Sequence, residues 1–271
     1  MSVDFSVKGK VIVITGATGV ICSALAKELA ALGAKLVLVS RHLESGKALA
    51  SEIKSVGGEA LALCADVLNK ASLNAAKEEA LSRFGSFDVL INGAGGNKPE
   101  ATTGPGHTFF QIDEEAFKNV LDLNLTGAFL SSQVFGEVLA QKGHGVILNI
   151  ASMASFQPLT NVLAYASAKA ALVNFTQWLA VHLNQNYSPD LRVNALAPGF
   201  FLTNQNRYLL QNADGLATER GMKILAKTPM GRYGSPEDLL GAVIWLCSES
   251  SRFVNGVVIP VDGGFSAYSG V

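Results

Sequence analysis

Short apolar runs alternate with amphipathic segments along the whole chain. The runs are nearly continuous in valine, isoleucine and leucine, and they cover residues 10–15, 35–40, 59–66, 88–93, 145–152, 191–198 and 256–264. Such runs are typical of strands buried on both faces of a parallel sheet. The segments between them, such as residues 23–34 and 73–85, carry apolar residues at helical spacing. The pattern predicts an α/β fold, a single-domain Rossmann-type doubly wound fold over residues 1–271, with about seven parallel strands and helices on both faces.

Two segments interrupt this alternation. Residues 94–112 are rich in glycine and proline, and residues 200–234 form a long mixed insertion before the last helical pattern. Both follow the carboxyl end of a predicted strand, which is where open α/β sheets bind their ligands. We expect residues 200–234 to form a lid over a substrate.

Composition narrows the class of protein. Hydrophobic residues make up 49% of the chain and charged residues only 16%, with a formal net charge of −1. No run of lysine and arginine exceeds two residues, which argues against nucleic acid as a partner. Every apolar stretch is interrupted before the ~20 residues that span a membrane, and the N-terminus is too polar for a signal peptide. We expect a soluble, cytoplasmic protein with no membrane contact.

The three cysteines, Cys22, Cys64 and Cys247, are far apart and each sits among apolar residues. Their odd number argues against a disulfide framework, and neither they nor the scattered histidines have the spacing of metal ligands. We expect buried, reduced thiols and no metal.

Tyr165 and Lys169 lie four residues apart, so a helix places them on one face, and Ser152 precedes the tyrosine. A lysine ammonium beside a phenol favours the phenolate and lowers a tyrosine pKa that is ordinarily about 10. Such a pair can donate and accept a proton near working pH. This spacing alone also fits an ordinary helix, and only the upstream serine and a nucleotide site favour the chemical interpretation.

A candidate nucleotide site follows the first predicted strand. Thr15, Gly16 and Gly19 open a helix there, and glycine lets backbone N–H groups approach a pyrophosphate. A glycine turn between strand and helix needs no ligand, but its place at the first such turn favours a dinucleotide.

These residues together resemble the short-chain dehydrogenase/reductase family, from about Lys8 to the C-terminus. The motifs that carry the resemblance are Thr15-Gly16, Asp66, Asn92-Gly93-Ala94-Gly95, Asn124, Ser152, Tyr165, Lys169, Pro198-Gly199 with Thr203, and Asp262-Gly263-Gly264. The chain departs from the family's usual TGxxxGxG, because Val20 and Cys22 occupy its second and third glycine positions. Gly93 stands where a second asparagine is usual. The loops, especially over residues 145–271, look like the D-mannonate oxidoreductase (fructuronate reductase) branch.

The resemblance implies an NAD(P)-dependent oxidoreductase that acts on CH–OH groups. Tyr165 would exchange a proton with the substrate oxygen, Ser152 would stabilise that oxygen, and Lys169 would bind the nicotinamide ribose. Asn124 would hold a water beside Lys169, although it could instead kink or cap its helix. The implied cofactor contacts are Gly16, Thr18, Gly19, Val20, Ile21, Ser40, Arg41, Asp66, Val67, Asn92, Gly93, Ala94, Tyr165, Lys169, Pro198, Gly199, Phe201 and Thr203, with Asp66 at the adenine amino group and Val67 packed on the ring.

Cofactor choice depends on the end of the second predicted strand. An acidic residue there pairs with a ribose 2′-hydroxyl, whereas a basic residue accommodates a 2′-phosphate. The chain has Ser40-Arg41, which favours NADP over NAD, although Arg41 could instead face solvent.

The predicted lid is rich in amides and cations, which suits a sugar acid. We predict substrate contacts at Lys98, Ser152, Asn206 and Arg207, although the lid charges could simply be solvated. D-mannonate and D-fructuronate are the leading substrates. Gluconate 5-dehydrogenase or 3-oxoacyl reductase activity is an alternative, and a non-catalytic dinucleotide-binding sensor is a remote one.

Subunit packing is a further expectation. The helical patterns around residues 113–141 and 162–186 carry aromatic residues on more than one side, including Phe129, Phe135, Phe175 and Trp178. One side would cover the sheet and the other would be available to a second subunit. The resemblance implies a homotetramer or, less often, a homodimer.

Overall fold

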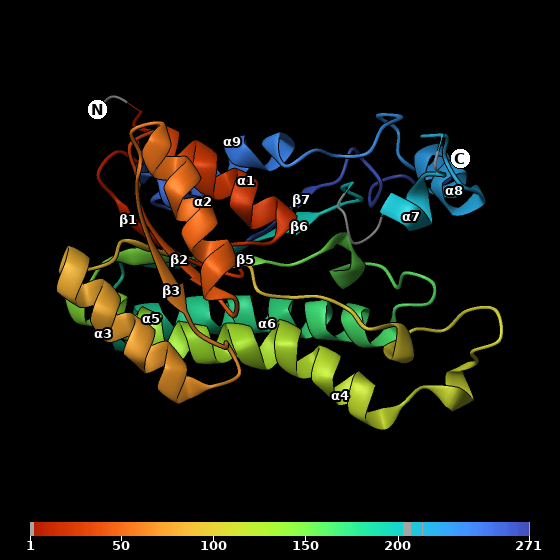
Figure 1. Ribbon diagram of the computed structural model, residues 1–271, viewed down its shortest axis with the longest axis horizontal. Coiled ribbons are helices and arrows are strands. Elements are labelled where there is room, and N and C mark those ends of the chain that lie inside the picture. Colours follow the sequence, from red (N-terminus) through yellow and green to blue (C-terminus); the bar gives the residue numbers. More distant parts are fainter. Residues whose placement is uncertain (1–2, 203–206, 213, 271) are drawn as a thin grey trace.

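A computed structural model describes residues 3–202, 207–212 and 214–270. Its strands form one parallel sheet in the order β3-β2-β1-β4-β5-β6-β7 (Figure 1). The strands are β1 (Val11–Thr15), β2 (Lys35–Ser40), β3 (Glu59–Cys64), β4 (Val89–Asn92), β5 (Gly145–Ile150), β6 (Leu191–Pro198) and β7 (Val258–Val261). Each strand lies within one of the predicted apolar runs, and the predicted fold class is confirmed.

Helices cover both faces of the sheet, as Figure 1 shows. One layer consists of α1 (Val20–Ala31), α2 (Leu43–Ser55) and α9 (Glu237–Cys247). The opposite layer consists of α3 (Lys70–Phe84), α4 (Glu114–Leu121), α5 (Gly127–Lys142) and α6 (Leu163–Asn186). No helix in the described part of the chain is long and apolar enough to cross a membrane.

Alternating side chains of β1 fill the two halves of the core. Ile12 and Ile14 are fully buried in the cluster beneath α1 and α2, whereas Val11 and Val13 belong to the cluster beneath α3 and α5. Because successive strand residues point to opposite faces, a strand covered on both sides must be apolar throughout. This explains the unbroken apolar runs of the sequence.

The strand order reverses beside β1, and this reversal positions the site. The chain leaves β1 through α1 toward β2 and β3, then returns through α3 to β4 on the other side of β1. The connections that leave the carboxyl ends of β1 and β4 therefore diverge. A crevice opens at such a point, and ligands of doubly wound folds bind there.

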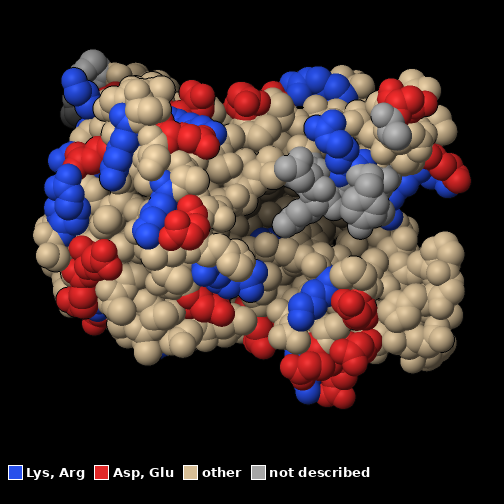
Figure 2. Space-filling view, viewed as in Figure 1, with Lys and Arg blue, Asp and Glu red and all other residues tan. Residues whose placement is uncertain are grey.

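Two projections extend beyond the carboxyl ends of the strands. The segment after β4 contains the 3₁₀ turns η1 (Pro99–Ala101) and η2 (Phe109–Gln111), and the segment after β6 contains α7 (Arg207–Leu210) and α8 (Glu219–Lys227). The space-filling view is hollowed between them (Figure 2). They correspond to the two segments that interrupt the sequence pattern.

The cysteines differ in part from the prediction. Cys22 and Cys247 are buried, as expected, but Cys64 is exposed. It is the last residue of β3, an edge strand of the sheet, and its thiol donates to the Arg41 carbonyl oxygen at 3.4 Å. An edge position leaves one flank of the strand uncovered, which a local apolar pattern does not reveal.

Candidate active site

The first strand-to-helix turn lies against the segment that follows β4. Gly16 has φ of +64°, and a Cβ at this position would lie 2.7 Å from the Ala94 Cα. The Thr15 hydroxyl accepts hydrogen bonds from the backbone N–H groups of Gly93 and Ala94 at 3.3 and 3.4 Å. Only glycine meets both the left-handed conformation and the close approach, so Gly16 is fixed by the structure of the turn.

The N-terminus of α1 is suited to an anion. Its N-cap, Gly19, provides no side-chain hydrogen bond, and the first turn contains no acidic residue. Val20 and Ile21 in that turn are half-buried, as is Thr18 before it. Uncapped N–H groups and the helix dipole favour negative charge there. The residues predicted to hold a pyrophosphate therefore lie together at the mouth of the crevice.

The residues predicted at the adenosine end lie at the ends of β2 and β3. Ser40 is buried and its hydroxyl donates to the His42 carbonyl oxygen at 3.0 Å, whereas Arg41 is exposed. Asp66 is half-buried and accepts from the Leu68 N–H at 2.9 Å through one carboxylate oxygen. Arg41 and the second Asp66 oxygen are the groups here that can reach a ligand.

The expectation that the Val67 side chain packs on the adenine ring does not fit the structure. Val67 is 4% exposed, and a Cβ on Gly127 at the start of α5 would lie 2.7 Å from its Cγ2. The notch left by Gly127 accommodates the valine side chain, which leaves almost none of it exposed to a ligand.

Asn92 and Phe201 also use their side chains for packing. The Asn92 amide donates to the Ser132 hydroxyl at 2.9 Å and to Asn149 Oδ1 at 2.8 Å, inside the layer between the sheet and α5. Phe201 is 4% exposed, and its ring fills the space beside Gly234. Both side chains are therefore buried in packing contacts.

The end of β6 lies close to the end of β7. A Cβ at Gly199, directly after Pro198, would lie 2.7 Å from the Asp262 Cα. The predicted residues Thr203 and Asn206 lie outside the described residues.

Ser152, Tyr165 and Lys169 converge beside the end of β5. Ser152 caps the 3₁₀ turn η4 (Met153–Ser155), and its hydroxyl accepts from the Ala154 N–H at 3.1 Å. Tyr165 and Lys169 lie in the first two turns of α6, and the Ser152 side chain lies close enough to the Tyr165 hydroxyl to act on its pKa. The Lys169 ammonium lies 5.6 Å from the centroid of the Tyr165 ring. The predicted set is thus brought together on one side of the crevice.

The ionisation of this pair differs from the sequence-based expectation. Burial raises the pKa of Tyr165, and the nearby Ser152 side chain only partly opposes that rise. The Lys169 ammonium donates to the Ile150 carbonyl oxygen at 2.7 Å, and burial lowers the pKa of Lys169 to about 8. The expected lowering of the tyrosine pKa is therefore wrong for the protein alone, because removal of the phenolate from water dominates.

Asn124 lies in a π-helical stretch, Asp122–Thr126, that separates α4 from α5. It is fully buried, and its amide donates to the carbonyl oxygens of Gly96 at 2.7 Å and Val120 at 2.8 Å. Its Oδ1 accepts from the Gly96 N–H at 3.2 Å. A π-bulge of this kind often marks a functional site. Asn124 therefore anchors the segment after β4 beside the reacting groups.

Gly95 contributes to the geometry around Lys169, although the sequence indicated it only as part of the motif Asn92-Gly93-Ala94-Gly95. A Cβ at this position would lie 2.7 Å from Asn124 Oδ1 and 3.3 Å from Lys169 Nζ. The missing side chain therefore leaves a small polar gap between the asparagine and the lysine.

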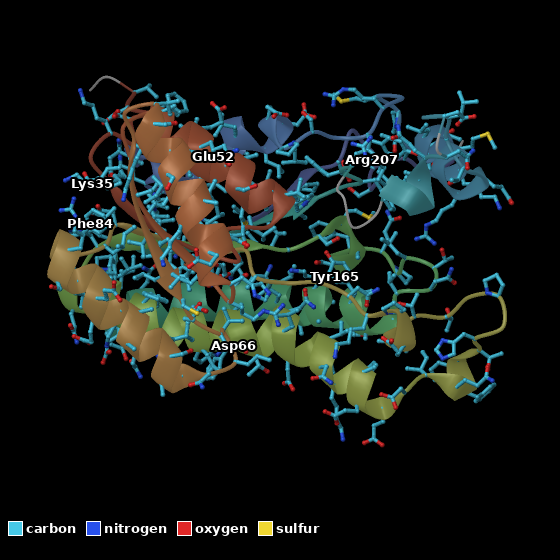
Figure 3. The ribbon with its side chains drawn as sticks, in the orientation of Figure 1. Lys35, Glu52, Asp66, Phe84, Tyr165 and Arg207 are labelled. Carbon is cyan, nitrogen blue, oxygen red and sulfur yellow. The ribbon has the colours of Figure 1, made fainter. Side chains whose placement is uncertain are left out.

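Two predicted substrate residues, Lys98 and Arg207, belong to different segments of the chain. Lys98 is exposed and precedes η1, whereas Arg207 is exposed on α7 and donates to Gln211 Oε1 at 3.4 Å. Figure 3 places Tyr165 on the helical layer that carries α6 and Arg207 on the opposite projection. The two cations therefore come from separate segments, one after β4 and one after β6.

The arrangement has three chemical capabilities. The α1 N-terminus favours an anion, the hydroxyl groups of Ser152 and Tyr165 can both bond one oxygen, and Lys169 supplies a nearby cation. All three lie along the carboxyl ends of the central strands. This combination suits proton transfer to or from an oxygen beside a bound dinucleotide.

Comparison with known proteins agrees with this geometry. The family model described as enoyl-(acyl carrier protein) reductase matches residues 16–266. The uncharacterized oxidoreductase UxuB of Bacillus subtilis is 53% identical over 97% of both chains. A crystal structure from Haemophilus influenzae, of a protein proposed to be a D-mannonate oxidoreductase with bound NAD, superposes with a TM-score of 0.92, 46% identity and 98% coverage of both chains.

A more distant solved structure carries the other nicotinamide cofactor. The gluconate 5-dehydrogenase of Burkholderia cenocepacia, in complex with NADP and tartrate, has a TM-score of 0.86 and 31% identity, covering 97% of this chain and 98% of that one. The match of the family model and these relatives over nearly the full length establish the assignment: the chain belongs to the short-chain dehydrogenase/reductase family of NAD(P)-dependent oxidoreductases.

Proposed function

We propose that this oxidoreductase transfers a hydride between a nicotinamide cofactor and the secondary alcohol or ketone of a sugar acid, with D-mannonate and D-fructuronate as the leading pair. The observation that carries the proposal is the convergence of Ser152 and Tyr165, with Lys169 one helical turn from the tyrosine, at the crevice. The substrate class is supported by likeness to the Haemophilus influenzae protein and to the gluconate 5-dehydrogenase.

The described residues fit a dinucleotide. The uncapped N-terminus of α1 offers N–H groups to a pyrophosphate, and the half-buried Asp66 offers a free carboxylate oxygen to an adenine amino group. The exposed Arg41 offers a cation to a 2′-phosphate, which favours NADP, whereas NAD needs no such contact. When bound, the nicotinamide supplies or accepts the hydride.

The protein's own part is proton transfer and orientation. Tyr165 would donate its proton to the carbonyl oxygen during reduction, which suits a phenol whose raised pKa keeps it protonated. Ser152 would donate a hydrogen bond to the same oxygen and stabilise the charge that develops there. Lys169 would turn from the Ile150 carbonyl toward a ribose hydroxyl, and Asn124 would hold the gap beside it open to a water.

Tyrosine 165 offers the direct test of these roles. Tyr165→Phe should lower kcat by roughly 10²–10⁴-fold, the usual contribution of a positioned acid–base group. Cofactor affinity, measured by fluorescence titration of the reduced nicotinamide, should stay unchanged because the ring is kept. Full turnover by this variant would contradict the role assigned to Tyr165 and revive a purely cofactor-binding function.

The substrate class requires a kinetic screen. Hexonates and hexuronates should be supplied with NAD, NADP or their reduced forms, and the change in reduced-nicotinamide absorbance recorded. The expected result is the highest kcat/KM with D-mannonate or D-fructuronate. Preference for gluconate or for an acetoacetyl thioester would favour the gluconate 5-dehydrogenase or 3-oxoacyl reductase alternative. No turnover with any sugar acid would exclude the proposed class.

We also propose that the protein self-associates through α5 and α6. Phe129 and Trp178 are exposed there and, with Leu125 and Phe175, line a shallow apolar groove. Phe129 and Phe175 pack edge to face at 6.1 Å, whereas Phe135 faces the core. A homotetramer or homodimer in light scattering would support this surface if Trp178→Glu weakened the assembly.

A further inference from the structure

Lys227, the last residue of α8, lies where three strand-end segments meet. Its ammonium donates to Gln157 Oε1 at 3.1 Å and lies 4.8 Å from the centroid of the Phe265 ring. Phe265 in turn packs edge to face on Phe200 at 5.1 Å. Gln157 follows β5, Phe200 follows β6 and Phe265 follows β7. The ammonium is therefore held at the carboxyl edge of the sheet, where the reacting residues also lie.

Gln157 links this lysine to the reacting serine. Its backbone N–H donates to the carbonyl oxygen of Met153, the residue next to Ser152, at 3.4 Å. Its side-chain amide donates to the Ser266 carbonyl oxygen at 2.8 Å while its oxygen accepts from Lys227. Both ends of the Gln157 amide are thus hydrogen-bonded. The turn that joins Met153 to Gln157 therefore connects the Lys227 ammonium to the segment that carries Ser152.

The charge of Lys227 lacks an acidic partner among the described residues. Lys223, one turn earlier on the same helix, is exposed and pairs with Glu219 at 2.6 Å. Lys227 is half-buried instead, and its only described polar partner is a neutral amide. An ammonium has three N–H donors, so two remain for a ligand. A partly desolvated cation with spare donors favours an anionic ligand.

We propose that Lys227, positioned by Gln157, binds the carboxylate of the sugar acid while Ser152 and Tyr165 bond the reacting oxygen. This inference rests on the proposed function and assigns recognition of the substrate's carboxylate to one residue. It places carboxylate recognition on α8 rather than on Lys98 or Arg207, which are exposed.

The test compares an acid with its uncharged amide. Lys227→Met removes the charge and keeps a chain of similar length. It should raise the KM of D-mannonate roughly 10–100-fold, the usual effect of losing a charge-assisted hydrogen bond. Binding that is equal in the ground and transition states affects KM alone, so kcat should change little. The inhibition constant of D-mannonamide, which lacks the carboxylate, should stay as in the wild type.

Three variants control for folding and packing. Lys223→Met, on the same helix but without contact to Gln157 or Phe265, should leave the KM of D-mannonate unchanged. Lys227→Arg keeps a cation and should restore part of the affinity for D-mannonate. Lys227→Gln keeps a polar side chain without the charge and should behave like Lys227→Met. Thermal unfolding of each variant would identify any that fails to fold.

The outcomes separate this inference from the proposed function. If the wild type turns over D-mannonate and Lys227→Met keeps its KM, the carboxylate site is wrong and the proposed function stands. If Lys227→Met weakens the acid and the amide equally, Lys227 only fastens the projection, and the inference is again overturned. If the wild type acts on no sugar acid with either cofactor, the proposed function fails and this inference fails with it.

Discussion

The Cys22 thiol fills the space that a side chain at Gly93 would otherwise occupy. An ideal Cβ built on Gly93 would collide with Cys22 Sγ and would lie 2.9 Å from the Thr15 carbonyl oxygen. The family pattern has the opposite sizes, with glycine at position 22 and asparagine at position 93. The two departures are thus matched in this chain, because a larger residue on α1 faces a smaller residue after β4. Burial raises the pKa of Cys22 to about 12, so the group is a neutral thiol that serves as packing.

This contact predicts that substitutions at the two positions are coupled. Gly93→Ala should destabilise the protein by roughly 1–3 kcal/mol, the usual effect of overfilling a packed site. Adding Cys22→Ala should recover part of that loss, because it removes the sulfur that the new methyl group meets. The recovery should be incomplete, since the Thr15 oxygen stays close. Urea unfolding of the four proteins in a double-mutant cycle measures the coupling.

A second buried cysteine provides the control for that cycle. Cys247→Ala also removes a buried thiol, on α9, but Cys247 has no contact with Gly93. It should not rescue Gly93→Ala. Additive effects of Cys22→Ala and Gly93→Ala would show that the two departures from the family pattern are independent.

We expect the substitution Gly95→Ala to lower turnover rather than to impair folding. Gly95→Ala places a methyl group 2.7 Å from Asn124 Oδ1 and 3.3 Å from Lys169 Nζ. Because small displacements of positioning groups can lower rates by about 10²-fold, we expect kcat to fall roughly 10–100-fold. Gly96→Ala is the matched control, since its methyl group would meet only Leu123 at an ordinary 3.6 Å. Equal kcat values for the two variants would show that the gap beside Lys169 has no role.

The fold and the reacting residues could be predicted because their signals are local. Unbroken apolar runs follow from burial on both faces of a parallel sheet, and the four-residue spacing of Tyr165 and Lys169 follows from helix geometry. The details that differ depend on contacts between distant segments. Val67 is buried because Gly127 leaves a notch, and the pKa of Tyr165 rises because neighbouring elements exclude water. The residues next to Val67 and Tyr165 in the sequence indicate neither effect.

Cofactor choice provides a third prediction, at Arg41. This residue is exposed after β2, and the adjacent Ser40 hydroxyl is already bonded to the His42 carbonyl oxygen. The guanidinium is therefore the group there that can contact a 2′-phosphate. Arg41→Ala should weaken NADPH binding roughly 10–100-fold, the usual effect of losing a hydrogen bond to a charged group, while leaving NADH nearly unaffected.

The matched control for Arg41 is Lys47→Ala on α2. Lys47 is also exposed, but it pairs with Glu44 at 3.0 Å. Its loss should change neither affinity. Titration of each variant with both reduced cofactors measures the selectivity, and an equal loss of NADPH and NADH binding would remove Arg41 from the 2′-phosphate site.

The burial of Lys169 predicts how the free energy of unfolding depends on pH. Its pKa is lowered from 10.5 to about 8 in the folded protein, so the folded state binds fewer protons than the unfolded state between these values. Keeping the charged lysine in the interior therefore lowers the stability of the folded protein. The full destabilisation applies below pH 8, and it declines as pH rises toward 10.5.

Lys169→Met should abolish efficient turnover yet stabilise the cofactor-free protein at neutral pH by roughly 1–3 kcal/mol. The loss of the hydrogen bond to the Ile150 carbonyl oxygen reduces this gain. Thermal unfolding across the alkaline range should show the advantage shrinking above pH 8, whereas Lys223→Met, at an exposed lysine, should follow the wild type throughout. A variant that is less stable than the wild type by a constant amount at every pH would mean that the Ile150 contact, and not the burial of charge, governs this position.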